Sequence, residues 1–242
     1  MDRNIKIDGI VIPIKVKKHW KNGIRYSICK KSVNLTMPKF LTKDAQEKEI
    51  EKLSNWAKSH FHNKPELLSS FRTRQYESGD EILIFDQTFV IEILKCDRKT
   101  GCAEIITSSH VLLKIPQILD DNEKNKMVGV LLSRVFSTHF INDIKERVFL
   151  YNKKYFGEKI ESVRLKNNQS NWGSCSSQKN INLSSRLLFA PKKILDYVII
   201  HELAHLKEMN HSPKYWSIVE KIMPDYRQYE KWLKVKGHEL AF

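Results

Sequence analysis

The distribution of apolar positions divides the chain into a strand-rich half and a helix-rich half. Ile5 to Val16 carries many β-branched residues, and Ile24 to Leu35 fits a returning strand. Lys21-Asn22-Gly23 lies between them, and Asn-Gly favours a hairpin turn because both residues tolerate positive φ. Further strands are predicted at residues 82–85, 88–94 and 103–106. The pattern therefore predicts a β-rich N-terminal region over residues 1–120, with no evident internal repeat.

Helical spacing marks the remaining elements. Thr42 is a candidate N-cap for a helix that begins at Lys43, whose apolar residues recur at intervals of three and four. A long helical pattern begins at residues 120–123 and runs toward Tyr155, and Gly157 ends it. After it we expect strands at 160–165 and 181–189, a polar loop at 167–180, and helices that begin at 191, 213 and 225. The sequence thus predicts an α+β protein whose second region covers residues 121–242.

The composition narrows the class of protein. The chain has 242 residues, 42 Lys and Arg against 28 Asp and Glu, and a formal net charge of +14. Its 41% hydrophobic content is typical of a globular protein. No apolar run approaches the roughly 18 residues of a membrane span, and the first residues do not form a secretory signal. We therefore expect a cytoplasmic protein without membrane contact, whose four cysteines lack C-x-x-C spacing and stay reduced.

His201-Glu202-Leu203-Ala204-His205 is an H-E-x-x-H motif within the apolar helix that begins at residue 191. Residues four apart on a helix point to nearly the same side, so His201 and His205 can offer two imidazole nitrogens to one ion. Glu202 lies about 100° further round the helix, beside the ion, where it can accept a proton from water. This pattern predicts a zinc site with Glu202 as general base.

A third protein ligand is expected, because catalytic zinc takes three and leaves one position for water. His211 stands at the spacing of the third histidine in metzincins, although Glu208 replaces the glycine of that pattern. The chain is expected to reverse at Asn210, since Asn tolerates left-handed backbone. His238 and Glu208 are the alternative third ligands.

Several separated motifs agree in order and spacing with those of one family of bacteria and archaea. The chain carries Trp172-Gly173-Ser174-Cys175, Ile181-Asn182-Leu183, Tyr197-Val198 before His201-Glu202-Leu203-Ala204-His205, and Asn210-His211-Ser212 before Tyr215-Trp216. Over about residues 164–232 it resembles the YgjP-like metallopeptidase family, which is related to the SprT-like and Wss1-like proteases. Ser184 and Tyr215 stand where the family usually has Asn and Phe.

The resemblance implies a zincin-like catalytic core with one zinc ion on His201, His205 and His211, and with Glu202 as catalytic base. In zincins a strand near the motif helix holds an extended peptide, so residues 181–188 are the candidate substrate-binding strand by analogy. No individual substrate-binding residue is identified.

Other chemistry-bearing residues have simpler explanations. Cys175 lacks a dedicated base, so a structural loop is favoured over a nucleophile, with Gly173 providing an unusual backbone angle. Ser174 or Asn182 is a candidate to orient a metal-binding histidine. Tyr226 and Tyr229 fit core packing, with electrophilic help to the reaction as the alternative.

These observations predict a zinc-dependent metallopeptidase that hydrolyses peptide bonds of a peptide or protein through a metal-activated water. Two alternatives stay open. One is a metal-dependent hydrolase of nucleoside triphosphates, which would suit the basic charge but lacks a G-x-x-x-x-G-K-[ST] phosphate loop. The other is a non-catalytic, zinc-stabilised basic module, and nucleic acid stays open as a partner.

Overall fold

The computed structural model describes residues 3–29, 32–71, 74–168 and 170–240. Its internal contacts form two compact units, residues 1–72 and residues 73–242. The boundary expected at 120 thus lies nearly fifty residues too late, because strands between 81 and 116 pack on the helix that follows them and share its core. The α+β class with a β-rich N-terminal region is confirmed.

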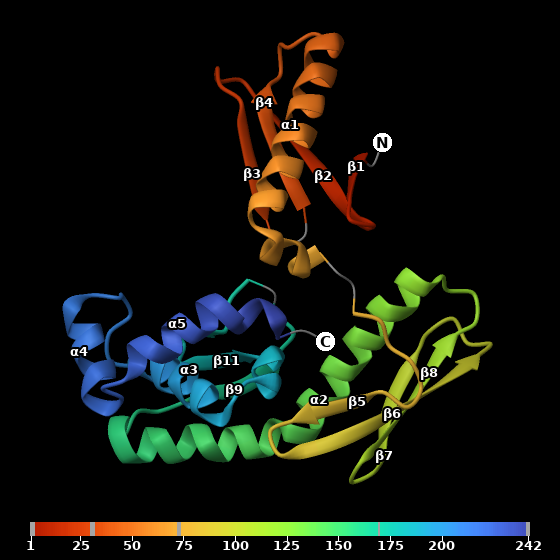
Figure 1. The fold of residues 1–242 in the computed structure, drawn as a ribbon. Helices are drawn as coiled ribbons and strands as arrows, with labels where there is room; N and C mark the ends of the chain where they lie inside the picture. The colour runs from red at the N-terminus through yellow and green to blue at the C-terminus, as the bar shows by residue number, and fades with distance from the viewer. Residues whose placement is uncertain (1–2, 30–31, 72–73, 169, 241–242) are drawn as a thin grey trace. The chain divides into compact units, whose positions relative to one another are not determined.

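The first unit is one sheet covered on one face by a helix (Figure 1). Its elements are β1 (Arg3–Ile7), β2 (Ile10–His19), β3 (Arg25–Cys29), β4 (Ser32–Pro38), α1 (Lys43–Asn63) and the 3-10 turn η1 (Pro65–Phe71). Helix α1 begins where expected, with the Thr42 side chain accepting from the Ala45 N–H. The core between sheet and helix contains residues such as Ile12, Leu35 and Leu53.

The Asn22-Gly23 hairpin prediction is wrong. The strand order is β1-β2-β4-β3, so β4 lies between β2 and β3 and pairs with both. The tight hairpin lies earlier, at Asp8-Gly9, where both residues have positive φ and connect β1 to β2. An Asn-Gly pair signals only a local turn, and it cannot exclude a third strand from entering between the two that it connects.

The second unit holds two further sheets and the long helices. Its elements are β5 (Glu81–Ile84), β6 (Gln87–Cys96), β7 (Cys102–Thr107), β8 (His110–Pro116), α2 (Asp121–Tyr151), the π turn η2 (Asn152–Phe156), β9 (Ser162–Lys166), β10 (Gly173–Cys175), β11 (Asn180–Ser184), the 3-10 turn η3 (Ser185–Phe189), α3 (Lys192–Ala204), α4 (Pro213–Ile222), α5 (Tyr226–Lys236) and η4 (Gly237–Glu239). The sheets have the orders β5-β6-β8-β7 and β10-β11-β9. Strands β8 and β10 were not expected from the sequence.

Helix α2 connects these two sheets, since it contacts β7 and β8 as well as β9 (Figure 1). Asp120 and Glu123 form a capping box at its start, and Gly157 in left-handed conformation ends the π turn that follows it. Both ends agree with the predicted long helix. Within the described residues, no helix is long and apolar enough to cross a membrane.

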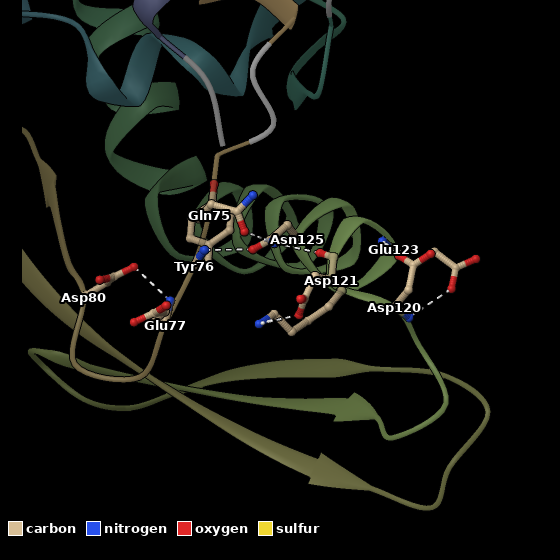
Figure 2. Close-up of polar contacts among 9 residues, drawn as sticks. Gln75, Tyr76, Glu77, Asp80, Asp120, Asp121, Glu123 and Asn125 are labelled. Atoms are coloured by element: carbon tan, nitrogen blue, oxygen red, sulfur yellow. Dashed lines mark hydrogen bonds and ion pairs between the residues drawn. The ribbon is translucent and has the colours of Figure 1, made fainter. Parts of the chain in front are cut away.

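Asn125 ties the chain ahead of β5 to the first turns of α2 (Figure 2). Its side chain is 2% exposed, accepts from the Tyr76 backbone N–H at 2.7 Å and donates to the Gln75 side chain at 2.7 Å. It also donates to the Asp121 carbonyl at 2.6 Å. This one amide therefore satisfies polar groups of two segments distant in sequence.

We expect Asn125→Ala to lower the free energy of unfolding by about 1 to 3 kcal/mol, because it leaves the Tyr76 N–H buried without an acceptor. Denaturant unfolding measures the change. The exposed Asn55→Ala in α1 is the control and should change stability by less than about 0.5 kcal/mol. Equal losses in the two variants would contradict this role of Asn125.

Candidate metal centre

The first two histidines, His201 and His205, lie at the C-terminal end of helix α3. Pro191 precedes its first turn, and ten of its residues are buried, because the helix packs against α2, α4, α5 and the β10-β11-β9 sheet. Residues 194–200 are all buried, so the helix leaves its histidines little solvent-facing surface. His201 and Glu202 stand in its last turn, and His205 is the C-cap residue.

The chain then reverses to bring His211 back to the same place. The N–H groups of residues 206–208 bond to the carbonyls of Leu203 and Ala204, and Ser212 caps α4 through the Tyr215 N–H. The expectation of left-handed backbone at Asn210 is wrong, since the described non-glycine residues with positive φ lie elsewhere. The chain reverses after α3 without left-handed backbone at Asn210, and the Ala204 carbonyl accepts from the N–H groups of both Lys207 and Glu208.

The nitrogen atoms of His201, His205 and His211 converge. One ligand atom from each lies within 4.8 Å of the others, and the Nε2 atoms of His201 and His211 are 3.2 Å apart. His205 contacts the Glu208 carbonyl through Nδ1 at 3.2 Å, which leaves its Nε2 lone pair free when Nδ1 carries the proton. The expected third histidine thus joins the first two.

This cluster has the donors that a zinc ion requires. Nitrogen ligands at about 2.0–2.1 Å from a tetrahedral ion are roughly 3.4 Å apart, close to the observed separation of His201 and His211. Burial, and then the two neighbouring imidazoles, lower the pKa of His201 to about 3, so this ring is neutral at neutral pH. A neutral imidazole is the form that binds metal. The residues present therefore fit a metal ion.

Glu202 lies beside the cluster in a dry environment. It is 4% exposed, and burial raises the pKa of its carboxyl to about 8, while the backbone N–H of Cys175 donates to it and opposes this rise. Cys175 belongs to β10, so the edge of the sheet lies directly against the carboxylate. Without a metal ion, this carboxyl therefore holds its proton at a higher pH than an exposed glutamate does.

Gly173 is needed for space rather than for an unusual backbone angle. It is absent from the glycines with positive φ, but a Cβ atom on it would lie 2.4 Å from the Glu202 Oε1 atom. Trp172 next to it packs between the Arg186 guanidinium, 3.9 Å from its ring, and Gly237. The Gly173 approach places β10 directly against α3, and the Trp172 contacts hold the start of β10 against η3 and η4. The expected role of Gly173 is thus corrected.

Tyr215 packs against all three histidines, although in the sequence it stands out only as a departure from the family pattern. Its buried ring stacks on His205 at 4.6 Å and meets the rings of His201 and His211 edge-on. Its hydroxyl donates to the His201 carbonyl at 2.9 Å. That carbonyl lies in the last turn of α3, where backbone acceptors lack helical partners. Tyr215 follows His211 by four residues, and this spacing in the sequence could have indicated that the two side chains lie close together.

The other candidate residues do not join the histidines within the described part of the chain. His238 lies 3.9 Å from the Glu239 carboxylate, and the Glu208 carboxylate lies 3.6 Å from Lys214. Asn182 donates to Ser174 at 3.3 Å rather than to a histidine. Their proposed metal or orienting roles therefore have no geometric support.

Cys175 and the aromatic residues of the C-terminal helices fit structural roles. Burial, together with Glu202, raises the pKa of the Cys175 thiol to about 11, opposite to what a nucleophile needs. Trp216 stacks on His211 at 5.6 Å and on Tyr226 at 5.2 Å, which makes Tyr226 part of the packing behind the site. Tyr229 lies 6.3 Å from the Tyr197 ring, again as packing.

The candidate substrate-binding strand, residues 181–188, is wrong. Strand β11 is the centre of its sheet, with β10 antiparallel on one side and β9 parallel on the other, so its backbone is already paired. Residues 185–189 form a 3-10 turn instead. The edge strand next to Glu202 is β10. Its three residues carry too little periodicity to be found from sequence.

Comparison with known proteins gives one family. The sequence model described as YgjP-like, metallopeptidase domain, matches residues 23–236. No curated protein matches the chain. Among solved structures, the metallopeptidase zymogen of Pyrococcus abyssi abylysin has 25% identity and a TM-score of 0.35, and covers 38% of this chain and 93% of its own. The metallopeptidase zymogen of Methanocaldococcus jannaschii jannalysin has 23% identity and a TM-score of 0.35, and the match covers 38% of this chain and 95% of the jannalysin chain.

We expect Tyr215→Phe to lower the free energy of unfolding by about 1 to 3 kcal/mol, because the His201 carbonyl loses its donor inside the protein. Tyr155→Phe removes a hydroxyl from a residue that is 39% exposed and serves as the matched control. Denaturant unfolding of both metal-free variants gives the comparison. If Tyr215→Phe matches the wild type, its hydroxyl does not stabilise the end of α3.

Proposed function

The chain belongs to the YgjP-like metallopeptidase family, and we propose that it hydrolyses peptide bonds with one zinc ion held by His201, His205 and His211. The observation that supports this most strongly is the convergence of three imidazole nitrogens within 4.8 Å beside a buried carboxylate. Zinc bound by three imidazoles supplies a Lewis acid that polarises a carbonyl and lowers the pKa of water.

Glu202 is proposed as the group that moves the proton. Its carboxylate accepts a proton from the water whose oxygen attacks the peptide carbonyl carbon, and it then gives this proton to the amide nitrogen as the C–N bond breaks. Without a metal ion, burial raises the pKa of this carboxyl to about 8. A cation held by the three histidines would lower that pKa and favour the carboxylate, which is the form that accepts the proton. The Cys175 N–H orients the carboxylate for both steps.

The substrate is proposed to lie along β10. This strand is the sheet edge beside Glu202, and an extended peptide can add to such an edge by backbone hydrogen bonds. The Gly173 carbonyl accepts from the exposed Asn171 side chain at 2.9 Å. A backbone N–H of a bound peptide can replace this donor. Peptide or protein substrates therefore suit the site better than a small molecule.

Glu202→Gln should bind about one zinc per chain and lose at least about a hundredfold in kcat, because the amide cannot accept the proton. Metal content by mass spectrometry and cleavage of an unfolded protein measure the two properties, with nucleoside triphosphates assayed beside the protein. Glu208→Gln is the control, since that carboxylate faces Lys214 rather than the histidines, and it should keep wild-type activity.

Loss of metal on chelation should abolish cleavage, and returning zinc should restore it. Full activity in Glu202→Gln would rule out the proposed base. Cleavage of nucleotides but not of proteins would reject the substrate class.

Gly173→Ala should lower kcat by roughly a hundredfold with metal content unchanged, because the added Cβ displaces the Glu202 carboxylate or β10. Ser174→Ala, one residue along the same strand, loses only a hydroxyl contact to Asn182 and should cleave normally. Wild-type kcat in Gly173→Ala would show that the close approach of β10 does not position Glu202.

A further inference from the structure

The chain contains the same arrangement of four strands and a helix twice, a repeat that is not evident in the sequence. The order β1-β2-β4-β3 is followed by α1, and the order β5-β6-β8-β7 is followed by α2 (Figure 1). In both sheets the outer pairs are antiparallel and the central pair is parallel.

Details of the two copies agree closely enough to match positions. The Lys39 N–H bonds to the His19 carbonyl at 2.8 Å, and the Gln117 N–H bonds to the Cys96 carbonyl at 3.1 Å, each just after the last strand. In both copies a side chain then caps the helix by accepting from the N–H three residues later. The two sheets can therefore be compared residue by residue.

One face of the first sheet packs on α1, and the other face is strongly basic. The strand positions opposite the core side carry Lys6, Lys15, Lys17 and Arg25, all exposed, together with Asn4, Ser27, Asn34 and Thr36. The exposed Val11, Pro13 and Cys29 lie on the same face. No Asp or Glu occupies a strand position on this face, and these four basic side chains form no ion pair with other described residues. Residues 1–72 hold 16 Lys and Arg against 7 Asp and Glu.

The matching face of the second sheet has the opposite character. Its exposed positions carry Glu81, Glu92 and Glu104 with a single basic residue, Lys114, and several apolar side chains. Glu92 and Lys15 occupy matching positions in the two sheets. Lys15 follows Ile14, which pairs with Val33 of the parallel strand β4. Glu92 follows Ile91, which pairs with Val111 of the parallel strand β8. The same fold thus tolerates acidic residues here, so the basic face of the first sheet is not required by folding.

The cations and neutral hydrogen-bonding groups of this face match the oxygens of a row of phosphates. Lys and Arg neutralise phosphates, and Asn, Ser and Thr bond to phosphate oxygens. Single strands are usually held by stacking on aromatic rings, yet none of the strand positions on this face is Phe, Tyr or Trp. Trp20, just beyond β2, is 76% exposed and has the Lys39 ammonium 5.0 Å from its ring, but it lies outside the strand positions of this face. These features favour a duplex, which is bound through its backbone.

We propose that the open face of the N-terminal sheet, centred on Lys6, Lys15, Lys17 and Arg25, binds the phosphate backbone of a nucleic-acid duplex without reading its base sequence. This inference does not depend on the proposed peptidase chemistry, which uses residues of the other unit.

The test compares two double variants of the full chain. Lys15→Gln with Lys17→Gln removes two charges from the open face. Lys43→Gln with Lys48→Gln removes two charges from exposed positions of α1 on the opposite side of the same sheet. Fluorescence anisotropy with a labelled DNA duplex, an RNA duplex, single-stranded DNA and polyglutamate measures affinity across a salt series.

The open-face variant should bind duplex roughly tenfold more weakly at low salt. The plot of log association constant against log salt concentration should become shallower, its negative slope losing about 1.8 in magnitude. The α1 variant should stay within about twofold of the wild type, because its lysines lie off the proposed contact. Preference for the DNA or the RNA duplex identifies which duplex the face binds, and either supports the proposal.

Three results would overturn the proposal. Equal weakening in both variants would show attraction by net charge alone. Tighter binding of single strands than of duplex would remove the duplex assignment. Binding of polyglutamate but of no nucleic acid would identify an acidic protein as the partner. Unchanged unfolding midpoints in both variants exclude misfolding as the cause of any loss.

Discussion

Two imidazole nitrogens 3.2 Å apart, with a third close by, present lone pairs to one another, and they repel unless a proton or a cation lies between them. This constraint decides the rest of the site. Packing holds the rings together, because His201 and His205 sit at the end of a largely buried helix and Tyr215 packs against all three rings. The packing of α3 therefore holds three imidazoles at a spacing that suits metal ligands.

Burial of the same helix also sets the environment of Glu202. The carboxylate lies out of solvent, under the edge strand β10, and a single backbone N–H partly offsets the cost of its charge. Proton affinity near neutral pH thus results from the packing of a helix against a sheet edge. The glycine at position 173 belongs to this packing, since any larger residue would occupy the space of the carboxylate.

The two copies of the strand-and-helix arrangement show how one backbone serves different purposes. In the second copy α2 extends past its sheet to support β9, and the sheet shares its core with the site. In the first copy the helix and sheet enclose a core of their own. Only the exposed faces differ in charge, because solvent-facing strand positions are free to change while core-facing positions must stay apolar.

The sequence by itself determined the features that depend on neighbours along the chain. Capping and helical periodicity located α1 and the start of α2, and the four-residue spacing of His201 and His205 placed both on one side of α3. The tertiary structure alone decided that β4 separates β2 from β3, that the units divide after residue 72, and that β10 rather than β11 forms the edge beside Glu202. Strand neighbours and close approaches join residues far apart in sequence, and local propensity carries no information about which distant segment fills a given space.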